Sequence, residues 1–217
     1  MERRAFLESS SLAAASALHW LRGGGLFGQV AQAPPGAQAT PILPGEPPNT
    51  IFVALVKAML PFDDPRFAAL TPAAIASSAN ALFGVDKDAD IARNLAVFDS
   101  LSLFASPPAA LTSAELAVYP PVPGDKSQPA TVEARVAADA KSYQTLSAHW
   151  NAAQTSFASL QLQEQRAYVM LWARSDLGIR RRFYRAMKSL IMAAAYSMDE
   201  AWALIGYAGP LLHFRSS

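Results

Sequence analysis

A few aspartates are the residues of this chain whose types and spacing could do chemistry. Asp63 and Asp64 precede a proline, and paired carboxylates can exchange protons, although adjacent aspartates before a proline are more typical of a turn. Residues 86–90 begin like a calcium-binding loop, but Ile91 and Val97 stand where such a loop requires glycine and glutamate. We therefore expect these carboxylates to shape turns and helix starts.

Other signatures of catalysis or cofactor binding fail on context. Residues 23–28 match G-x-G-x-x-G, but that motif binds a dinucleotide only between a strand and a helix, and no strand is predicted before it. Beyond residue 39 the histidines are His149 and His213, which have no ligand-spaced companion. The chain has no cysteine, which excludes thiolate ligands. We expect no catalytic, cofactor-binding or metal-binding residue in this chain.

The first residues resemble a targeting signal. Arg3 and Arg4 form a charged start, Phe6 and Leu7 follow, and a weakly apolar stretch of small residues continues to Leu21. This pattern is similar to the twin-arginine signal, which directs folded proteins across a bacterial inner membrane. An ordinary secretory signal with two arginines is the alternative. In either case the sequence predicts export to the periplasm.

Residues 1–39 are therefore expected to be a signal peptide. The motif A-x-A allows cleavage after Ala33 or Ala39, and the later site is favoured because Pro34 directly follows the earlier one. The apolar stretch is shorter than the ~20 residues that a spanning helix needs. Residues 40–48 are rich in proline and are predicted to be an extended linker.

Composition limits the partners of the mature chain. The formal net charge is +1, and removing residues 1–39 takes away three arginines and two glutamates, which leaves a neutral chain. Such a chain has no electrostatic footprint for nucleic acid. Residues 49–217 have the length of a single domain that can bury a core. At 52% hydrophobic residues, the chain also has apolar surface to offer to a partner.

The apolar spacing predicts an all-α fold, an irregular helical bundle behind an extended proline-rich lead-in, because no alternating strand pattern occurs. Three helices are predicted in the first half. Their inward residues are Phe52, Leu55, Val56 and Met59, before Pro61; Ile75, Ala79 and Leu82, between the cap Thr71 and Gly84; and Ile91, Leu95 and Phe98, after Asp88 or Asp90. Residues 112–115 fit the capping box of a further short helix.

The second half has a stronger helical period. Apolar residues three and four apart predict one long amphipathic helix, with a seam of Val136, Ala140, Tyr143, Leu146, Trp150, Ala153 and Phe157. Two more helices are predicted, around Tyr168, Leu171 and Trp172, and around Phe183, Met187, Leu190, Ile191 and Ala194.

Two further features suit a surface that binds a protein. One is a basic run, for which a solvated helix face is the plainer interpretation; it comprises Arg174, Arg180, Arg181, Arg182, Arg185 and Lys188. The other is an aromatic C-terminal tail shaped by glycine and proline, which contains residue types that anchor interfaces.

This tail also carries a family resemblance. The pattern Trp202-x-x-Ile205-Gly206-Tyr207-x-Gly209-Pro210, preceded by Phe183-Tyr184 and Tyr196-Ser197, resembles the C-terminal signature of the gluconate 2-dehydrogenase subunit 3 family. The run Leu60-Pro61-Phe62-Asp63-Asp64-Pro65 is similar to the LP-x-D turn near the start of those small subunits. The resemblance covers most of the mature chain in order and layout, and the middle matches by periodicity alone.

The resemblance implies a non-catalytic small subunit that binds a large FAD-dependent dehydrogenase of the glucose–methanol–choline type. The small subunit would escort the folded, FAD-loaded enzyme through twin-arginine export, and a c-type cytochrome subunit often completes such complexes. Membrane contact would come only through the complex, and the substrate would be a sugar or an alcohol. The expected partner-binding residues are Trp202, Tyr207, Pro210, Tyr184, Arg181, Arg185 and Lys188. A free-standing helical periplasmic binding protein or an uncharacterised enzyme is the alternative.

Overall fold

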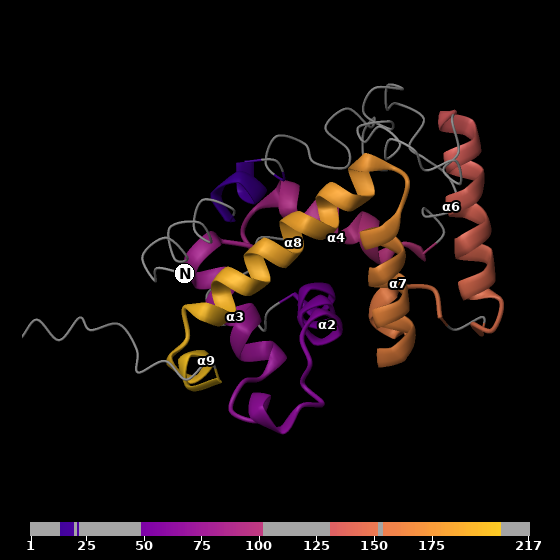
Figure 1. The fold of residues 1–217 in the computed structure, drawn as a ribbon. Helices are drawn as coiled ribbons and strands as arrows, with labels where there is room; N and C mark the ends of the chain where they lie inside the picture. The colour runs from indigo at the N-terminus through magenta and orange to yellow at the C-terminus, as the bar shows by residue number, and fades with distance from the viewer. Residues whose placement is uncertain (1–13, 20, 22–48, 102–130, 152–153, 205–217) are drawn as a thin grey trace, which may run out of the picture.

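The computed structural model describes residues 14–19, 21, 49–101, 131–151 and 154–204. Within these ranges the chain is all-α, as predicted, and no strand is present (Figure 1). The α-helices are α2 (Thr50–Met59), α3 (Pro72–Phe83), α4 (Ala89–Asp99), α6 (Val132–Ser147), α7 (Leu162–Arg174), α8 (Gly178–Tyr196) and α9 (Asp199–Leu204). Two 3₁₀ turns join them, η1 (Pro65–Phe67) and η3 (Phe157–Ser159).

Side-chain caps fix where most of these helices begin. The side chains of Asn49, Thr71, Asp88 and Thr131 accept hydrogen bonds from the first free backbone N–H groups of α2, α3, α4 and α6. Helix α3 ends at Gly84, whose φ of 66° lies in the left-handed region that favours glycine. The predicted start at Thr71 and stop at Gly84 are thereby confirmed, and of the two starts predicted for α4, Asp88 or Asp90, the structure has Asp88.

An aromatic cluster centred on Phe98 of α4 forms the middle of the core. The ring of Phe98 lies 4.7 Å from Phe157, 5.0 Å from Trp172 and 4.9 Å from Phe183, measured between centroids. Tyr168 completes the cluster, and its hydroxyl donates to the carbonyl oxygen of Phe98 at 3.3 Å. Because these rings come from α4, η3, α7 and α8, one cluster ties distant parts of the chain together.

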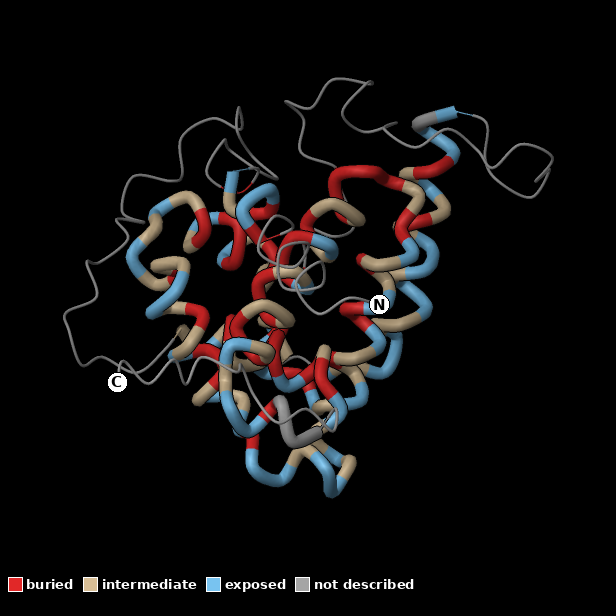
Figure 2. Tube along the Cα trace, turned by 60° about the vertical axis from the view of Figure 1, so that its left-hand side comes forward, coloured by how far each residue is buried: buried red, intermediate tan, exposed pale blue. Residues whose placement is uncertain are grey.

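The long helix α8 lies at the centre of the helix packing. It packs against α3 and α7, and α2 lies against α3 and α7 in turn (Figure 1). Helix α6 stands at the edge of the molecule and packs on α7. Figure 2 shows buried residues running through the middle of the molecule and exposed ones on its outer turns. No helix in the described ranges combines the length and apolarity needed to cross a bilayer.

The structure corrects two predictions. The seam from Val136 to Phe157 is not one helix, because α6 ends at Ser147 and a turn follows. In that turn the side-chain oxygen of Gln154 accepts a 2.7 Å hydrogen bond from the backbone of Asn151, which competes with helix continuation. The other correction concerns Leu82, which was expected inside and is 53% exposed. The remaining inward residues predicted for α2, α3, α4, α7 and α8 are buried or half-buried.

Part of the N-terminal segment also belongs to the core. Residues 14–19 are helical, and Ala14, Ala17 and Leu21 are buried in the same cluster as the domain that follows (Figure 1). This packing was not predicted, because residues 1–39 were expected to be a signal peptide separate from the domain. The short helix expected at 112–115 and the linker 40–48 lie outside the described residues.

Candidate functional site

The turn that resembles the family and the helix in which the C-terminal pattern begins lie close together. The turn after α2 continues into η1, and η1 contacts α9, the helix that contains Trp202 (Figure 1). Leu60 is buried at the start of the turn, and Phe62 packs edge-on against Phe67 with ring centroids 6.3 Å apart. The turn, η1 and α9 together are the candidate functional site, and we call them the turn–α9 end.

Both carboxylates of the turn are held by arginines. Asp63 accepts a hydrogen bond of 2.6 Å from Arg166 of α7, and this bond lowers the pKa of Asp63. Asp64 caps η1 by accepting from the backbone N–H of Arg66, and the side chain of Arg66 lowers the pKa of Asp64 to about 2. These ionised, paired carboxylates stabilise the turn. This agrees with the sequence analysis, in which adjacent aspartates before a proline were interpreted as a turn.

The expected cationic contacts lie on the outer side of α8. Arg185 and Lys188 are exposed, and Arg181 and Tyr184 are half-buried. Arg181, Arg185 and Lys188 follow one another at helical spacing, so they share a side of α8 that differs from the buried row of Phe183. The sequence therefore placed the basic face correctly on α8.

One member of the basic run lies elsewhere. Arg180 was counted with a solvated face, but its side chain is only 5% exposed. Its Nη1 atom lies 3.1 Å from Oδ2 of Asp139 on α6, and its guanidinium lies 5.9 Å from the ring centre of Trp172. Arg180 is thus a buried cation that lies near both a carboxylate and an aromatic ring.

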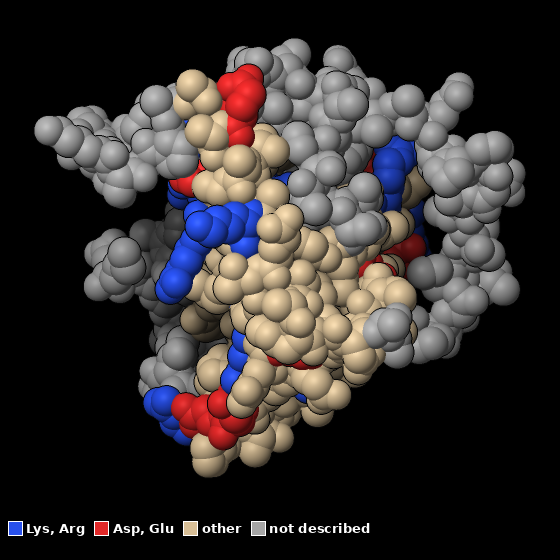
Figure 3. Space-filling view, turned by 90° about the vertical axis from the view of Figure 1, so that its right-hand side faces the viewer, with Lys and Arg blue, Asp and Glu red and all other residues tan. Residues whose placement is uncertain are grey.

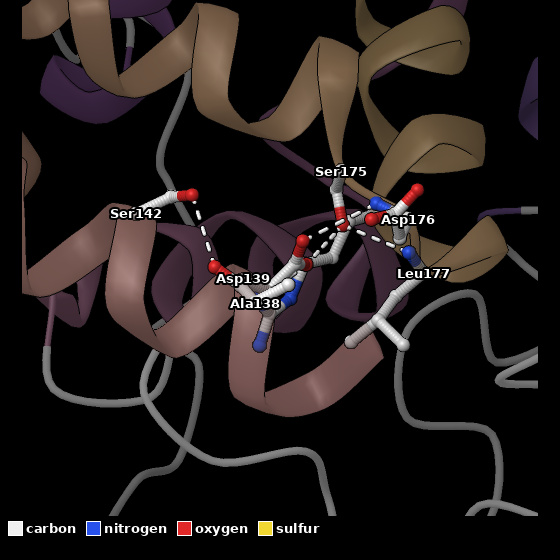
Figure 4. Close-up of polar contacts among 7 residues, drawn as sticks. Ala138, Asp139, Ser142, Ser175, Asp176 and Leu177 are labelled. Carbon is white, nitrogen blue, oxygen red and sulfur yellow. Dashed lines mark hydrogen bonds and ion pairs between the residues drawn. The ribbon is translucent and has the colours of Figure 1, made fainter. Parts of the chain in front are cut away.

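Asp139 is the centre of a polar cluster that joins α6 to the turn between α7 and α8 (Figure 4). Its carboxylate accepts hydrogen bonds from the hydroxyl of Ser175, the backbone N–H of Asp176 at 3.2 Å and the guanidinium of Arg180. The hydroxyl oxygen of Ser175 in turn accepts from the backbone N–H of Leu177 at 3.0 Å. We call Asp139, Ser175 and Arg180 the corner cluster.

The electrostatics of the corner cluster suit positioning. Burial raises the pKa of Asp139, and the hydrogen bond from Ser175 and the charge of Arg180 oppose that rise. Burial likewise lowers the pKa of Arg180, against the attraction of Asp139. Since Ser175 is only 2% exposed and its hydroxyl donates to a carboxylate, it is placed to fix the turn. The signal in the sequence was weak: Asp139 adjoins the apolar seam of α6.

The side of the molecule where α6 lies has an uncharged centre. Figure 3 shows lysine, arginine, aspartate and glutamate mostly at the margins of this face. The chain has no such residue between Lys141 and Glu164, and the exposed side chains of the second half of α6 include Ser142, Gln144 and Thr145. The exposed cations of α8 are therefore the better candidate for an electrostatic contact.

Several expected residues cannot be placed at a site. Trp202 lies in α9, but its side chain is outside the description, and Tyr207 and Pro210 lie outside the described residues. The same holds for the signal residues Arg3, Arg4, Phe6 and Leu7. His149 is exposed. In the described part of the chain, no group of three or more His, Cys, Asp or Glu residues could hold a metal ion.

Comparison with known proteins adds no relative. No family model, no curated protein and no solved structure matches this chain.

Proposed function

We propose that this chain is the non-catalytic small subunit of a periplasmic FAD-dependent sugar or alcohol dehydrogenase, as the gluconate 2-dehydrogenase subunit 3 family provides. It would escort the folded, FAD-loaded large subunit through twin-arginine export and stabilise it. A c-type cytochrome subunit is a further candidate partner. The observation that supports this proposal most is the turn–α9 end, because η1, which continues the LP-x-D-like turn, contacts α9, where the C-terminal pattern begins.

The construction of this end suits a docking surface. The ion pair between Asp63 and Arg166 fixes the turn on α7, and the cap of Asp64 fixes η1. A preorganised surface loses little conformational entropy when a partner binds. Arg185 and Lys188 are exposed cations on α8, and they favour an acidic rim on the large subunit.

The export role is tested by changing the signal. In the bacterium that makes this protein, Arg3→Lys with Arg4→Lys should retain both this chain and its flavoprotein in the cytoplasm, because the twin-arginine pair is the address for both. Arg22→Lys, which lies outside the pair, is the matched control. Dehydrogenase activity and immunoblots of periplasmic fractions give the answer. Undiminished flavoprotein activity in the periplasm of the double variant would refute the escort role.

A further inference from the structure

Part of the predicted signal peptide is packed on the folded domain. Ala14 and Leu21 are fully buried, Ala17 is 6% exposed, and Leu18 packs against the same core. The spacing of these four residues places them on one helical face. Residues 15, 16 and 19, which belong to the other face, are exposed. The segment therefore behaves as an amphipathic helix whose apolar side is satisfied by its own domain.

A polar contact fixes the position of the segment. Asn94 lies on the buried face of α4 among Ile91, Leu95 and Phe98 and is only 2% exposed. Its amide nitrogen donates to the carbonyl oxygen of Leu21 at 3.3 Å and to that of Asp90 at 2.7 Å. A buried amide is costly unless it is hydrogen-bonded, so the contact with Leu21 helps to explain an asparagine on an apolar helix face.

We infer that residues 14–19 and 21 are an internal ligand of α4, an autoinhibitory contact that conceals the apolar face of this part of the N-terminal segment in the folded chain. Small side chains at positions 14 and 17 let the segment lie close to the domain, and Asn94 sets its register. If the proposed function is correct, this contact affects export. The machinery that reads the signal must first displace these residues from α4.

Thiol labelling of the intact chain tests the inference. The chain has no cysteine, so a single introduced thiol is unique. Ala17→Cys places the thiol on the buried face. Ala15→Cys, two residues earlier, places it on the exposed face and is the matched control. A maleimide should react at least about tenfold more slowly at position 17 than at position 15, because labelling at position 17 requires local opening. In urea the two rates should converge.

A second variant tests the anchor. Asn94→Ala should speed labelling at position 17 by about fivefold, the effect of one lost hydrogen bond, and leave position 15 unchanged. Arg93→Ala, at an exposed position of the same helix, should change neither rate. Equal rates at positions 15 and 17 in the native chain would overturn the inference, as would an Asn94→Ala variant with an unchanged rate at position 17. Export plays no part in this assay, so failure of the docking and failure of the proposed function are separate results.

Discussion

Arg180 and Asp139 bind each other in the interior, with side chains that are 5% and 8% exposed and a distance of 3.1 Å between Nη1 and Oδ2. The pair joins α8 to α6 at the corner where α7 ends, and Ser175 and the backbone of Asp176 complete the shell of the carboxylate. An edge helix is thus attached to the body by polar contacts as well as by apolar packing.

Asp139→Ala should lower the free energy of unfolding by about 3 kcal/mol, because it leaves a buried guanidinium without its carboxylate. Glu133→Ala, at an exposed position of α6, should stay within about 0.5 kcal/mol. Urea unfolding followed by circular dichroism measures both. Asp139→Leu combined with Arg180→Met should recover much of the loss. If Asp139→Ala were as stable as its control, the corner cluster would not hold α6.

The carboxylate of Asp64 should titrate with a pKa of about 2 in the folded chain, from an ordinary value of 3.8. Since the folded pKa is lowered, the contribution of this group to stability is complete above pH 3.8 and is lost as the pH falls toward 2. Carbon-detected NMR titration gives the value directly. Arg66→Gln should return the pKa toward 3.8, whereas Arg93→Gln should leave it unchanged. An unshifted pKa in the native chain would contradict the described cap.

Phe98→Ala should cost about 4 kcal/mol, because the ring contacts four other aromatic side chains and its loss leaves a cavity. Leu82→Ala, in the neighbouring helix α3 but 53% exposed, should change stability by less than about 0.5 kcal/mol. Thermal and urea unfolding distinguish the two. A loss at position 82 as large as that at position 98 would show that the aromatic cluster is not the centre of the core.

Arg185→Glu with Lys188→Glu should slow association with the proposed large subunit about tenfold at low salt and leave the stability of this chain unchanged. The reason is loss of long-range attraction to an acidic rim, so the difference should shrink as salt is added. Lys57→Glu, an exposed cation on α2, is the control. Stopped-flow or surface-plasmon association rates test this. A salt-independent effect, or an equal effect of Lys57→Glu, would remove the basic face from the interface.

Much of the fold follows from local sequence signals. Thr71 before a proline, Asp88 before an apolar period and Gly84 at a helix end act through their own backbone neighbours, so their effects can be inferred from the sequence. The inward faces of α4 and α8 were predicted for a similar reason. Apolar residues at helical spacing lie on one face of a helix, and that face packs against the core.

The corrections arise where distant partners decide the outcome. The apolar spacing through Trp150 and Phe157 fits one helix, but Phe157 instead folds back against Phe98, and α6 ends at Ser147. Arg180 can be buried because Asp139, on another helix, forms an ion pair with it. Leu21 is likewise buried, and it accepts a hydrogen bond from Asn94, which is far away in sequence.

The accessory-subunit proposal is tested most directly by purifying this chain, with an affinity tag at its C-terminus, from the organism that makes it. Flavin released by acid is then measured by fluorescence and compared with the amount of the chain. We predict about one FAD per copy of this chain, together with dye-linked dehydrogenase activity toward a sugar or an alcohol, in a complex larger than the chain alone. A stable, monodisperse monomer without flavin would contradict the proposal.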